Sequence, residues 1–376
     1  MVIRVRLVLL SLILGASTLA VSAPSSSASM WSLGSLPSVS NSGSAVSCVS
    51  SSACIGVGGT SPGFGWAYGW NGMSWASPAA LTGPAGATRA SLAGVSCSAS
   101  HECTAVGSFI NSAGETQTLA ERGPSEILGT WSVQTTVSPT SDSSFAAVSC
   151  PSSKACTAVG SKESSTALAE GWNGTEWLAQ TVPTPSEGEH PHLYGVSCSA
   201  ASECTAVGDY FTTKGFTLNH ALVDRWNGKE WVVQTVPSPE GALDTALFGV
   251  SCVSATACTA VGDYYDGTHN HAMVARWNGT SWSLQKAAVP SEELNSEFLA
   301  VSCATTEACT AVGGYDNKSE HVTLAEHWNS KEWLVQTTPN PSNNSALEGV
   351  SCTSTTACMA FGLDTSNKTI LAERYS

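Results

Sequence analysis

Histidines, carboxylates and tyrosines gather in two neighbouring stretches of the chain, at positions 187–220 and 263–271. Such side chains are divalent-metal ligands, and aromatic rings beside carboxylates are suited to holding a sugar. The candidate ligand-binding residues are His190, His192, Asp209, Tyr210, His220, Asp263, Tyr264, Asp266, His269 and His271. Two alternatives stay open: the same side chains could hold a divalent metal such as calcium, or these stretches are solvated polar loops with Asp209 and Asp263 as turn formers.

Catalysis by these stretches is a further alternative. Two carboxylates on one face can hydrolyse a glycosidic bond, and Glu187, Glu189, Asp209 and Asp263 are the candidates, although nothing singles out a pair. Ser-His-Asp catalysis is likewise not supported by the sequence. No catalytic residue is therefore assigned. The sequence favours a non-enzymatic binding protein, and the alternative is an extracellular hydrolase that acts on a polysaccharide.

The elements that position these residues belong to a repeat marked by two cysteines with five residues between them. All 14 cysteines belong to the pattern, in the pairs Cys48/Cys54, Cys97/Cys103, Cys150/Cys156, Cys198/Cys204, Cys252/Cys258, Cys303/Cys309 and Cys352/Cys358. Successive first cysteines lie 48 to 54 residues apart, which is the length of a propeller blade.

One repeat predicts four short strands, which we call a to d. Strand a is Tyr194–Cys198, strand b is Cys204–Gly208, strand c is Ala221–Trp226 and strand d is Trp231–Thr235, with an Asn-Gly turn between c and d. No segment has a helical period. The prediction is an all-β, seven-bladed β-propeller over residues 29–376, with four antiparallel strands in each blade.

The two ends of the chain predict how the ring closes. The last repeat ends after its strand c, Thr369–Tyr375, whereas Ser29–Leu33 resembles a strand d without the other three. We expect this N-terminal strand to complete the last blade, because a ring then has no broken edge. Three residues before each first cysteine the chain has only Gly or Ala, as expected where strands a converge near the axis.

The cysteines are predicted to form seven disulfides, each between the two ends of a five-residue a–b loop, where opposed residues are close enough to be bridged. Zinc is the rival interpretation, but structural zinc ligands come as closer pairs in sets of four. Arg4 and Arg6, the apolar run Leu7–Leu14 and the small residues before position 24 predict a signal peptide over 1–23, followed by a linker over 24–28. We therefore expect a secreted, extracellular protein without a membrane span.

Net charge excludes one class of partner. The chain carries a formal charge of −14, which disfavours binding to a phosphate backbone, so nucleic acid is not expected as a partner. A glycan or a protein ligand remains, and the chain is expected to be a monomer without a cofactor.

The pattern G-V-S-C-x(5)-C-T-A-V-G followed by L-A-E-R-W-N-G-x-x-W resembles repeats of secreted bacterial proteins, actinobacterial ones especially, that are taken to be β-propellers. The resemblance covers nearly all of the chain after the predicted signal peptide and implies the architecture, not an activity. The turn Asn278–Trp282 also looks like a shortened Asp-box of sialidase-like propellers. It lacks the aspartate, and an Asp-box is structural, so no sialidase activity is implied.

Blade topology predicts which side carries function. The a–b and c–d turns share one side and are nearly the same in every repeat, whereas the b–c and d–a connections share the other side and vary. Because binding residues concentrate in variable loops on a rigid scaffold, we expect the ligand on the b–c/d–a side. The repeated Glu-Arg step in strand c, for example Glu121-Arg122, is interpreted as pairing between blades rather than as a charged binding ring.

Overall fold

The computed structural model describes residues 30–34, 36, 42–59, 63–76, 78–81, 83–99, 101–125, 130–137, 142–163, 165–186, 188–212, 218–288, 290 and 293–376. The predicted signal peptide, the predicted linker and Glu187 lie outside these residues. Every regular element within them is a β-strand. No described helix is long and apolar enough to span a membrane.

The strands form five four-stranded sheets and one eight-stranded sheet in which a single pair, Gly59 with Ser91, joins two four-stranded units. We number the units as blades one to seven. Blade one comprises β2 (Ser42–Ser50), β3 (Ala53–Gly59), β4 (Trp66–Trp70) and β5 (Ala79–Ala80). Blade two comprises β6 (Arg89–Cys97), β7 (Glu102–Ile110), β8 (Thr116–Pro124) and β9 (Ser132–Gln134). Blade three comprises β10 (Ser143–Ser152), β11 (Ala155–Lys162), β12 (Thr166–Trp172) and β13 (Trp177–Gln180).

The remaining blades follow the same order along the chain. Blade four comprises β14 (Glu189–Ala200), β15 (Glu203–Thr212), β16 (Leu218–Trp226) and β17 (Trp231–Gln234). Blade five comprises β18 (Asp244–Ser254), β19 (Ala257–Tyr265), β20 (Asn270–Trp277) and β21 (Trp282–Gln285). Blade six comprises β22 (Glu293–Thr305), β23 (Ala308–Asn317), β24 (Glu320–Trp328) and β25 (Trp333–Gln336). Blade seven comprises β26 (Ser345–Ser354), β27 (Ala357–Asp364), β28 (Thr369–Tyr375) and β1 (Trp31–Leu33).

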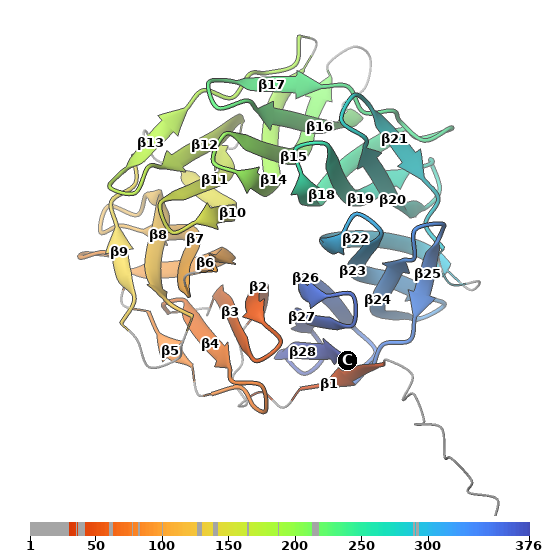
Figure 1. Cartoon of the computed structure of the whole chain (residues 1–376), viewed down its shortest axis with the longest axis horizontal. Helices are drawn as coiled ribbons and strands as arrows, with labels where there is room; N and C mark the ends of the chain where they lie inside the picture. Colours follow the sequence, from red (N-terminus) through yellow and green to blue (C-terminus); the bar gives the residue numbers. More distant parts are fainter. Residues whose placement is uncertain are drawn as a thin grey trace, which may run out of the picture.

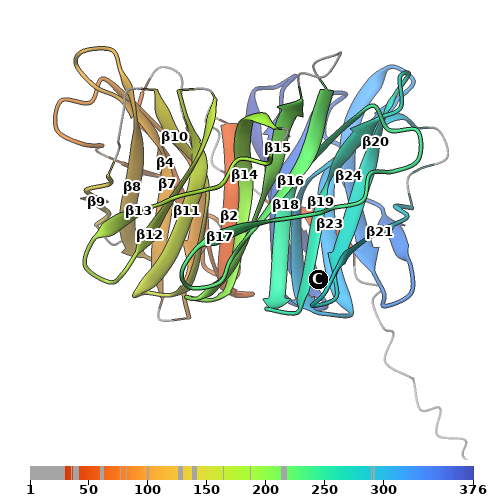
Figure 2. The same cartoon turned by 90° about the horizontal axis from the view of Figure 1, so that it is seen from above.

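The sheets are arranged around a central axis, with the first strand of each blade innermost and the fourth on the outside (Figure 1). Seen from the edge, the strands run between the two sides of the ring (Figure 2). All pairings between strands are antiparallel within the described sheets. The fold is a β-propeller, as the repeat predicts.

The first and last strands of the chain lie in one sheet. β1 pairs with β28, with Trp31 opposite Tyr375 and Leu33 opposite Glu373. Trp31 is only 6% exposed, and its Nε1 donates to Gln336 Oε1 in blade six at 2.8 Å. The same bond joins Trp231 to Gln180 and Trp333 to Gln285, so Trp31 occupies the place of a strand-d tryptophan.

All seven predicted disulfides are present, and the Cα atoms of each pair are 3.9–4.0 Å apart. The hairpins differ from the prediction in one respect. The strands continue past the cysteines, so the turn in blade four is only Ala201 and Ser202, and a bulge after Cys198 accommodates the extra residue. The disulfide therefore joins two paired strands rather than the ends of a loop.

The two cysteines of a pair differ in burial, whereas the expected five-residue loop would place both alike at the ends of a turn. The second cysteine is buried in every blade, with these exposed fractions: Cys54 1%, Cys103 0%, Cys156 4%, Cys204 1%, Cys258 3%, Cys309 1% and Cys358 5%. The first cysteines are half-buried, except for Cys150, which is buried. The physical reason is that strand b lies between strands a and c, so its cysteine packs in the core between blades. These sulfur atoms are therefore held in structural disulfides.

Residues beside the cysteines join each blade to the next, which the spacing alone does not reveal. The serine before each first cysteine accepts a hydrogen bond from the backbone N of the first cysteine in the following blade, for example Cys252 N to Ser197 Oγ at 2.9 Å. The bond occurs at every junction, including Cys48 N to Ser351 Oγ at 3.0 Å between blades one and seven. The small residue three before each cysteine is required at the same contact, because a Cβ on Gly249 would lie 2.9 Å from the Cα of Ala300.

The Glu-Arg step lies between blades, as interpreted from the sequence. At the same acidic position in two blades whose next residue is Gly171 or His327, Glu170 accepts a hydrogen bond from Val137 N and Glu326 accepts one from Ala288 N, so each holds the d–a connection of the preceding blade. Where an arginine follows the acidic residue, it points the other way, because neighbouring residues of a strand face opposite sides. Arg122 lies over the ring of Trp172 in the following blade.

Candidate functional site

We call the side of the ring with the a–b and c–d turns the disulfide side, and the side with the b–c and d–a connections the variable side. One row of paired residues near the disulfide side runs Cys198, Cys204, Trp226, Trp231 across blade four. The candidate residues lie toward the opposite ends of the same strands. Eight of the ten were expected in loops but lie in strands, and only Asp266 and His269 lie in a connection. The prediction was wrong there because the hairpin ladders extend several residues further than the apolar pattern indicates.

His192 and Asp209 form the inner group of blade four. They are cross-strand partners, and His192 Nδ1 lies 3.4 Å from Asp209 Oδ1. Tyr194 donates its hydroxyl to the same oxygen at 3.1 Å, and its ring stacks on that of His192. Asp209 is 5% exposed, and burial raises its pKa, an effect that Tyr194 and His192 partly offset. This carboxylate therefore holds neighbouring side chains in place and is not open to a ligand.

Tyr210 and His220 form a second pair, across β15 and β16. They are cross-strand partners with ring centroids 5.5 Å apart, and His220 Nε2 lies 3.1 Å from Thr212 Oγ1. His190 is separate from both groups, exposed at the irregular start of β14, with its ring 6.3 Å from that of Phe211. The five candidates of blade four thus form three small groups instead of one site.

Tyr264 and His271 form the corresponding pair in blade five. Their rings are 5.0 Å apart across β19 and β20. His271 Nε2 donates to Asp266 Oδ2 at 2.9 Å, and Asp266 also accepts bonds from Thr268 Oγ1 at 2.6 Å and from the backbone N of His269. These donors, Thr268 first, hold the pKa of Asp266 below its usual range. Asp266 therefore stays ionised and fixes the orientation of the His271 ring.

A cavity of about 210 Å³ opens beside this pair. Tyr264 and His271 line it together with Met273, Leu284 and Pro239, so aromatic and apolar groups meet two polar rings. The cavity is smaller than the ~300–1,000 Å³ of sites for drug-sized ligands and suits one small group. Of the ten candidates, these two line it.

A neighbouring cavity of about 220 Å³ contains residues that sequence reasoning missed. Glu297, Asp316 and His321 of blade six line it, with Asn270 of blade five at its edge. His321 Nδ1 lies 2.8 Å from Asp316 Oδ1, which repeats the ion pair of His271 with Asp266. In both pairs four residues separate the aspartate from the histidine, and this shared spacing was a signal available in the sequence.

Asp263 is the last of the ten candidates. It precedes Tyr264 in β19 and therefore faces away from the pair of Tyr264 and His271. Burial, together with the negative charges of Glu297, Asp244 and Asp209, raises its pKa to about 7. Burial also raises the pKa of Glu348 to about 7. Carboxylates of blades four to seven thus influence one another, although no group of three or more metal-ligating side chains gathers within the described ranges.

The fold is similar to those of several solved structures. The GH74 xyloglucanase from Xanthomonas campestris matches with a TM-score of 0.55 and 10% identity, over 92% of this chain and 55% of that one. YCF48 from Cyanidioschyzon merolae matches with a TM-score of 0.57 and 12% identity, over 92% of this chain and 98% of that one. Sqt1 from Chaetomium thermophilum matches with a TM-score of 0.51 and 9% identity, over 89% and 95%.

These similarities are of fold alone, because the identities are so low. The chain spans about half the length of the xyloglucanase. No family model matches the chain, and no curated protein matches it. The seven intrachain disulfides indicate an oxidising environment.

Proposed function

We propose that this protein is a secreted, monomeric, non-enzymatic binding propeller that recognises a glycan, a cell-envelope component or a protein through the variable side of its ring. The scaffold is a closed ring of seven blades. Two contacts support closure: the pairing of β1 with β28, and the bond from Cys48 N to Ser351 Oγ, which joins blades one and seven as equivalent bonds join the other blades. The disulfides support export, since such bonds persist outside the cytoplasm.

The cavity beside Tyr264 and His271 is the observation that carries the binding proposal. An aromatic ring on an apolar floor suits the C–H face of a sugar or the side chain of a peptide. Asp266 pre-organises His271 for a polar contact, which lowers the cost of ordering the site on binding. Blade four has the similar pair Tyr210 and His220, but neither of the two cavities described above includes it.

A polysaccharide hydrolase is the second candidate, supported by one observation. Asp263 has a pKa raised to about 7, and Glu297 is among the charges that raise it. A carboxyl group that stays protonated near neutral pH beside a second carboxylate is the arrangement that a glycosidase uses as its general acid. The similar folds do not decide the choice, because one belongs to a xyloglucanase and others have no such name.

A paired screen separates the two candidates. The purified protein is applied to a glycan array with and without calcium, and a polysaccharide panel is assayed for release of reducing ends. We expect saturable binding to a restricted set of glycans and no release of reducing ends. Reducing ends that disappear in the Asp263→Asn variant would replace the binding proposal with the hydrolase. Binding seen only with calcium would assign the metal a role that the described side chains do not suggest.

A further inference from the structure

Four junctions between blades on the disulfide side contain the same cation–π contact. An arginine of strand c places its guanidinium over a tryptophan of strand c in the next blade. The distances from the guanidinium carbon to the ring centroid are 4.8 Å for Arg122 and Trp172, 4.8 Å for Arg225 and Trp277, 5.0 Å for Arg276 and Trp328, and 5.9 Å for Arg374 and Trp70. The attraction is stronger the further the pair is removed from water.

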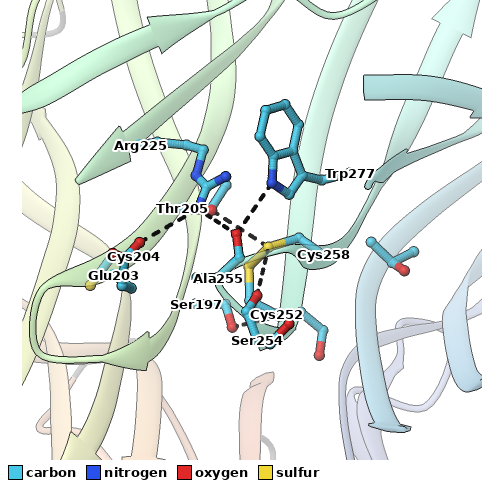
Figure 3. Close-up of a disulfide and its surroundings, with 12 residues drawn as sticks. Ser197, Glu203, Cys204, Thr205, Arg225, Cys252, Ser254, Ala255, Cys258 and Trp277 are labelled. Carbon is cyan, nitrogen blue, oxygen red and sulfur yellow. Dashed lines mark hydrogen bonds and ion pairs between the residues drawn. A yellow bond between two sulfur atoms is a disulfide. The ribbon is translucent and has the colours of Figure 1, made fainter. Parts of the chain in front are cut away.

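In three of these contacts the guanidinium also donates a hydrogen bond to a backbone carbonyl oxygen of the next blade. Arg225 Nη2 donates to the carbonyl oxygen of Ala255 at 2.7 Å, and Trp277 Nε1 donates to the same oxygen at 3.2 Å (Figure 3). Ala255 is the third residue after the first cysteine of its blade. Arg122 and Arg276 donate to the residues at the same position, Ser153 and Thr306. A tryptophan ring and this turn carbonyl together form a receptor for a guanidinium.

The junction between blades three and four has the receptor without its arginine. Gly171 stands at the arginine position, since it pairs with Thr157 as Arg225 pairs with Thr205. Trp226 keeps the tryptophan position opposite Cys204, with its ring packed 5.7 Å from that of Trp231. The covered tryptophans at positions 172, 277 and 328 are each 8% exposed, whereas Trp226 is only partly buried.

An open groove of about 480 Å³ occupies this junction. It is lined by Trp172, Trp226, Ala201, Gly171, Gln180 and Lys154, among others. Ala201 is the third residue after Cys198, so its carbonyl group is the counterpart of the acceptor at Ala255. The groove thus combines the aromatic ring and the turn position that hold an arginine elsewhere in the ring.

We propose that this groove binds an arginine side chain of a partner protein, with the guanidinium over Trp226 and a hydrogen bond to the carbonyl of Ala201. The guanidinium is planar, stacks on aromatic rings and sheds water more readily than an ammonium, so arginine fits better than lysine. The acidic chain, with its charge of −14, favours approach of a cationic partner.

A sugar on Trp226 is the competing occupant, and the polar groups of the groove suit it less well. Gln180 Oε1 already accepts a bond from Trp231 Nε1 at 3.0 Å. Asn173 Oδ1 accepts bonds from Thr175 and from Glu176 N. These amide oxygens are therefore occupied, whereas a guanidinium requires only the ring and a carbonyl group. Lys154 also lines the groove, and its positive charge repels a cation. Replacing this lysine therefore tests the proposal.

The experiment uses the peptide acetyl-Gly-Arg-Gly-amide and its citrulline counterpart, which has the same shape without the charge. Binding is measured from the NMR shift of the Trp226 indole N–H, assigned with a Trp226→Phe variant, and from the titration curve. We expect the arginine peptide to shift this signal at millimolar concentration and the citrulline peptide to bind about tenfold more weakly. Equal binding of the two peptides, or no shift with arginine, would overturn the proposal.

Three variants sharpen the result. Gly171→Arg should supply the missing guanidinium internally and abolish peptide binding, since the side chain displaced by its Cβ is the flexible amide end of Gln180. Gly69→Arg, the same change at the equivalent position in blade one, is the matched control and should leave binding unchanged. Lys154→Glu should increase the affinity for the arginine peptide severalfold.

Thermal denaturation shows that each variant is folded, and if Gly171→Arg does not fold, Trp226→Leu replaces it and should also abolish binding. Unchanged binding in Gly171→Arg or Trp226→Leu, or a neutral saccharide that shifts Trp226 without responding to Lys154→Glu, would contradict the proposal.

Discussion

The disulfide side and the variable side of the ring differ in how closely one blade repeats the next. On the disulfide side, a serine–cysteine bond occurs at all seven junctions, and a cysteine pair occurs in every blade. On the variable side, the two cavities at blades five and six depend on residues that most blades lack. The repeated residues therefore hold blades together, while the departures from the repeat shape the places where a ligand fits. Gly171 is such a departure on the disulfide side.

Removing Trp31 should have the largest effect on the scaffold. Trp31→Ala deletes a buried ring that packs 5.5 Å from Tyr375 and bonds Gln336, so we expect a loss of ~3–5 kcal/mol in the free energy of unfolding. Denaturant unfolding measures it, and Trp31→Phe is the control that keeps most of the packing. A loss below ~1 kcal/mol would mean that β1 does not close the ring.

Removing one disulfide should cost less. Replacing Cys252 and Cys258 with alanine is expected to lower the free energy of unfolding by ~2 kcal/mol, because the closed loop is short. The readout is again denaturant unfolding. Glycan binding on the variable side should not change, and a lost glycan affinity in a folded variant would break the separation of the two sides.

Glu373 should make stability depend on pH. Its carboxylate is 0% exposed and has no hydrogen-bond partner in the described part of the chain, and burial raises its pKa from 4.5 to about 8. The folded state therefore binds the proton more tightly than the unfolded state, and this stabilisation, complete below about pH 4.5, is lost as the pH rises to about 8. Glu373→Gln should raise the free energy of unfolding above pH 8 by ~1–3 kcal/mol and flatten the pH profile. An unchanged profile would show that the carboxylate is solvated.

Asp266 should have the smallest effect of the four. Asp266→Asn removes the charge that orients His271 but keeps a side chain able to accept the turn bonds from Thr268 and His269. We expect the free energy of unfolding to fall by less than ~1 kcal/mol, as for other exposed ion pairs. The affinity for a glycan selected on the array should fall two- to fivefold. Calorimetric titration measures the affinity, and Asp316→Asn in blade six is the matched control.

Residue spacing predicted the architecture well because it acts through local geometry. The five residues between cysteines place both on one hairpin, and the Gly or Ala three residues earlier follows from how closely strands a approach the neighbouring blade. The site was predicted less well. Tyr264 and His271 meet because the ladder continues past the apolar core, and apolar pattern alone does not show where a ladder ends. Glu297 and His321 line one cavity because of how β22 and β24 pack in the sheet. The sequence of neither strand shows this by itself. The groove at Gly171 exists because this glycine stands where blade four has Arg225. Only the comparison of the two blades in three dimensions shows this.

The most direct test compares Tyr264→Ala with Tyr210→Ala in calorimetric titration with a glycan selected on the array. The two tyrosines occupy the same register in blades five and four, each beside a histidine, and only Tyr264 lines the cavity beside Met273. We expect at least a tenfold loss of affinity for Tyr264→Ala and a change below about twofold for Tyr210→Ala, with both variants folded. Equal effects, or full affinity in Tyr264→Ala, would contradict recognition by the variable side of blade five.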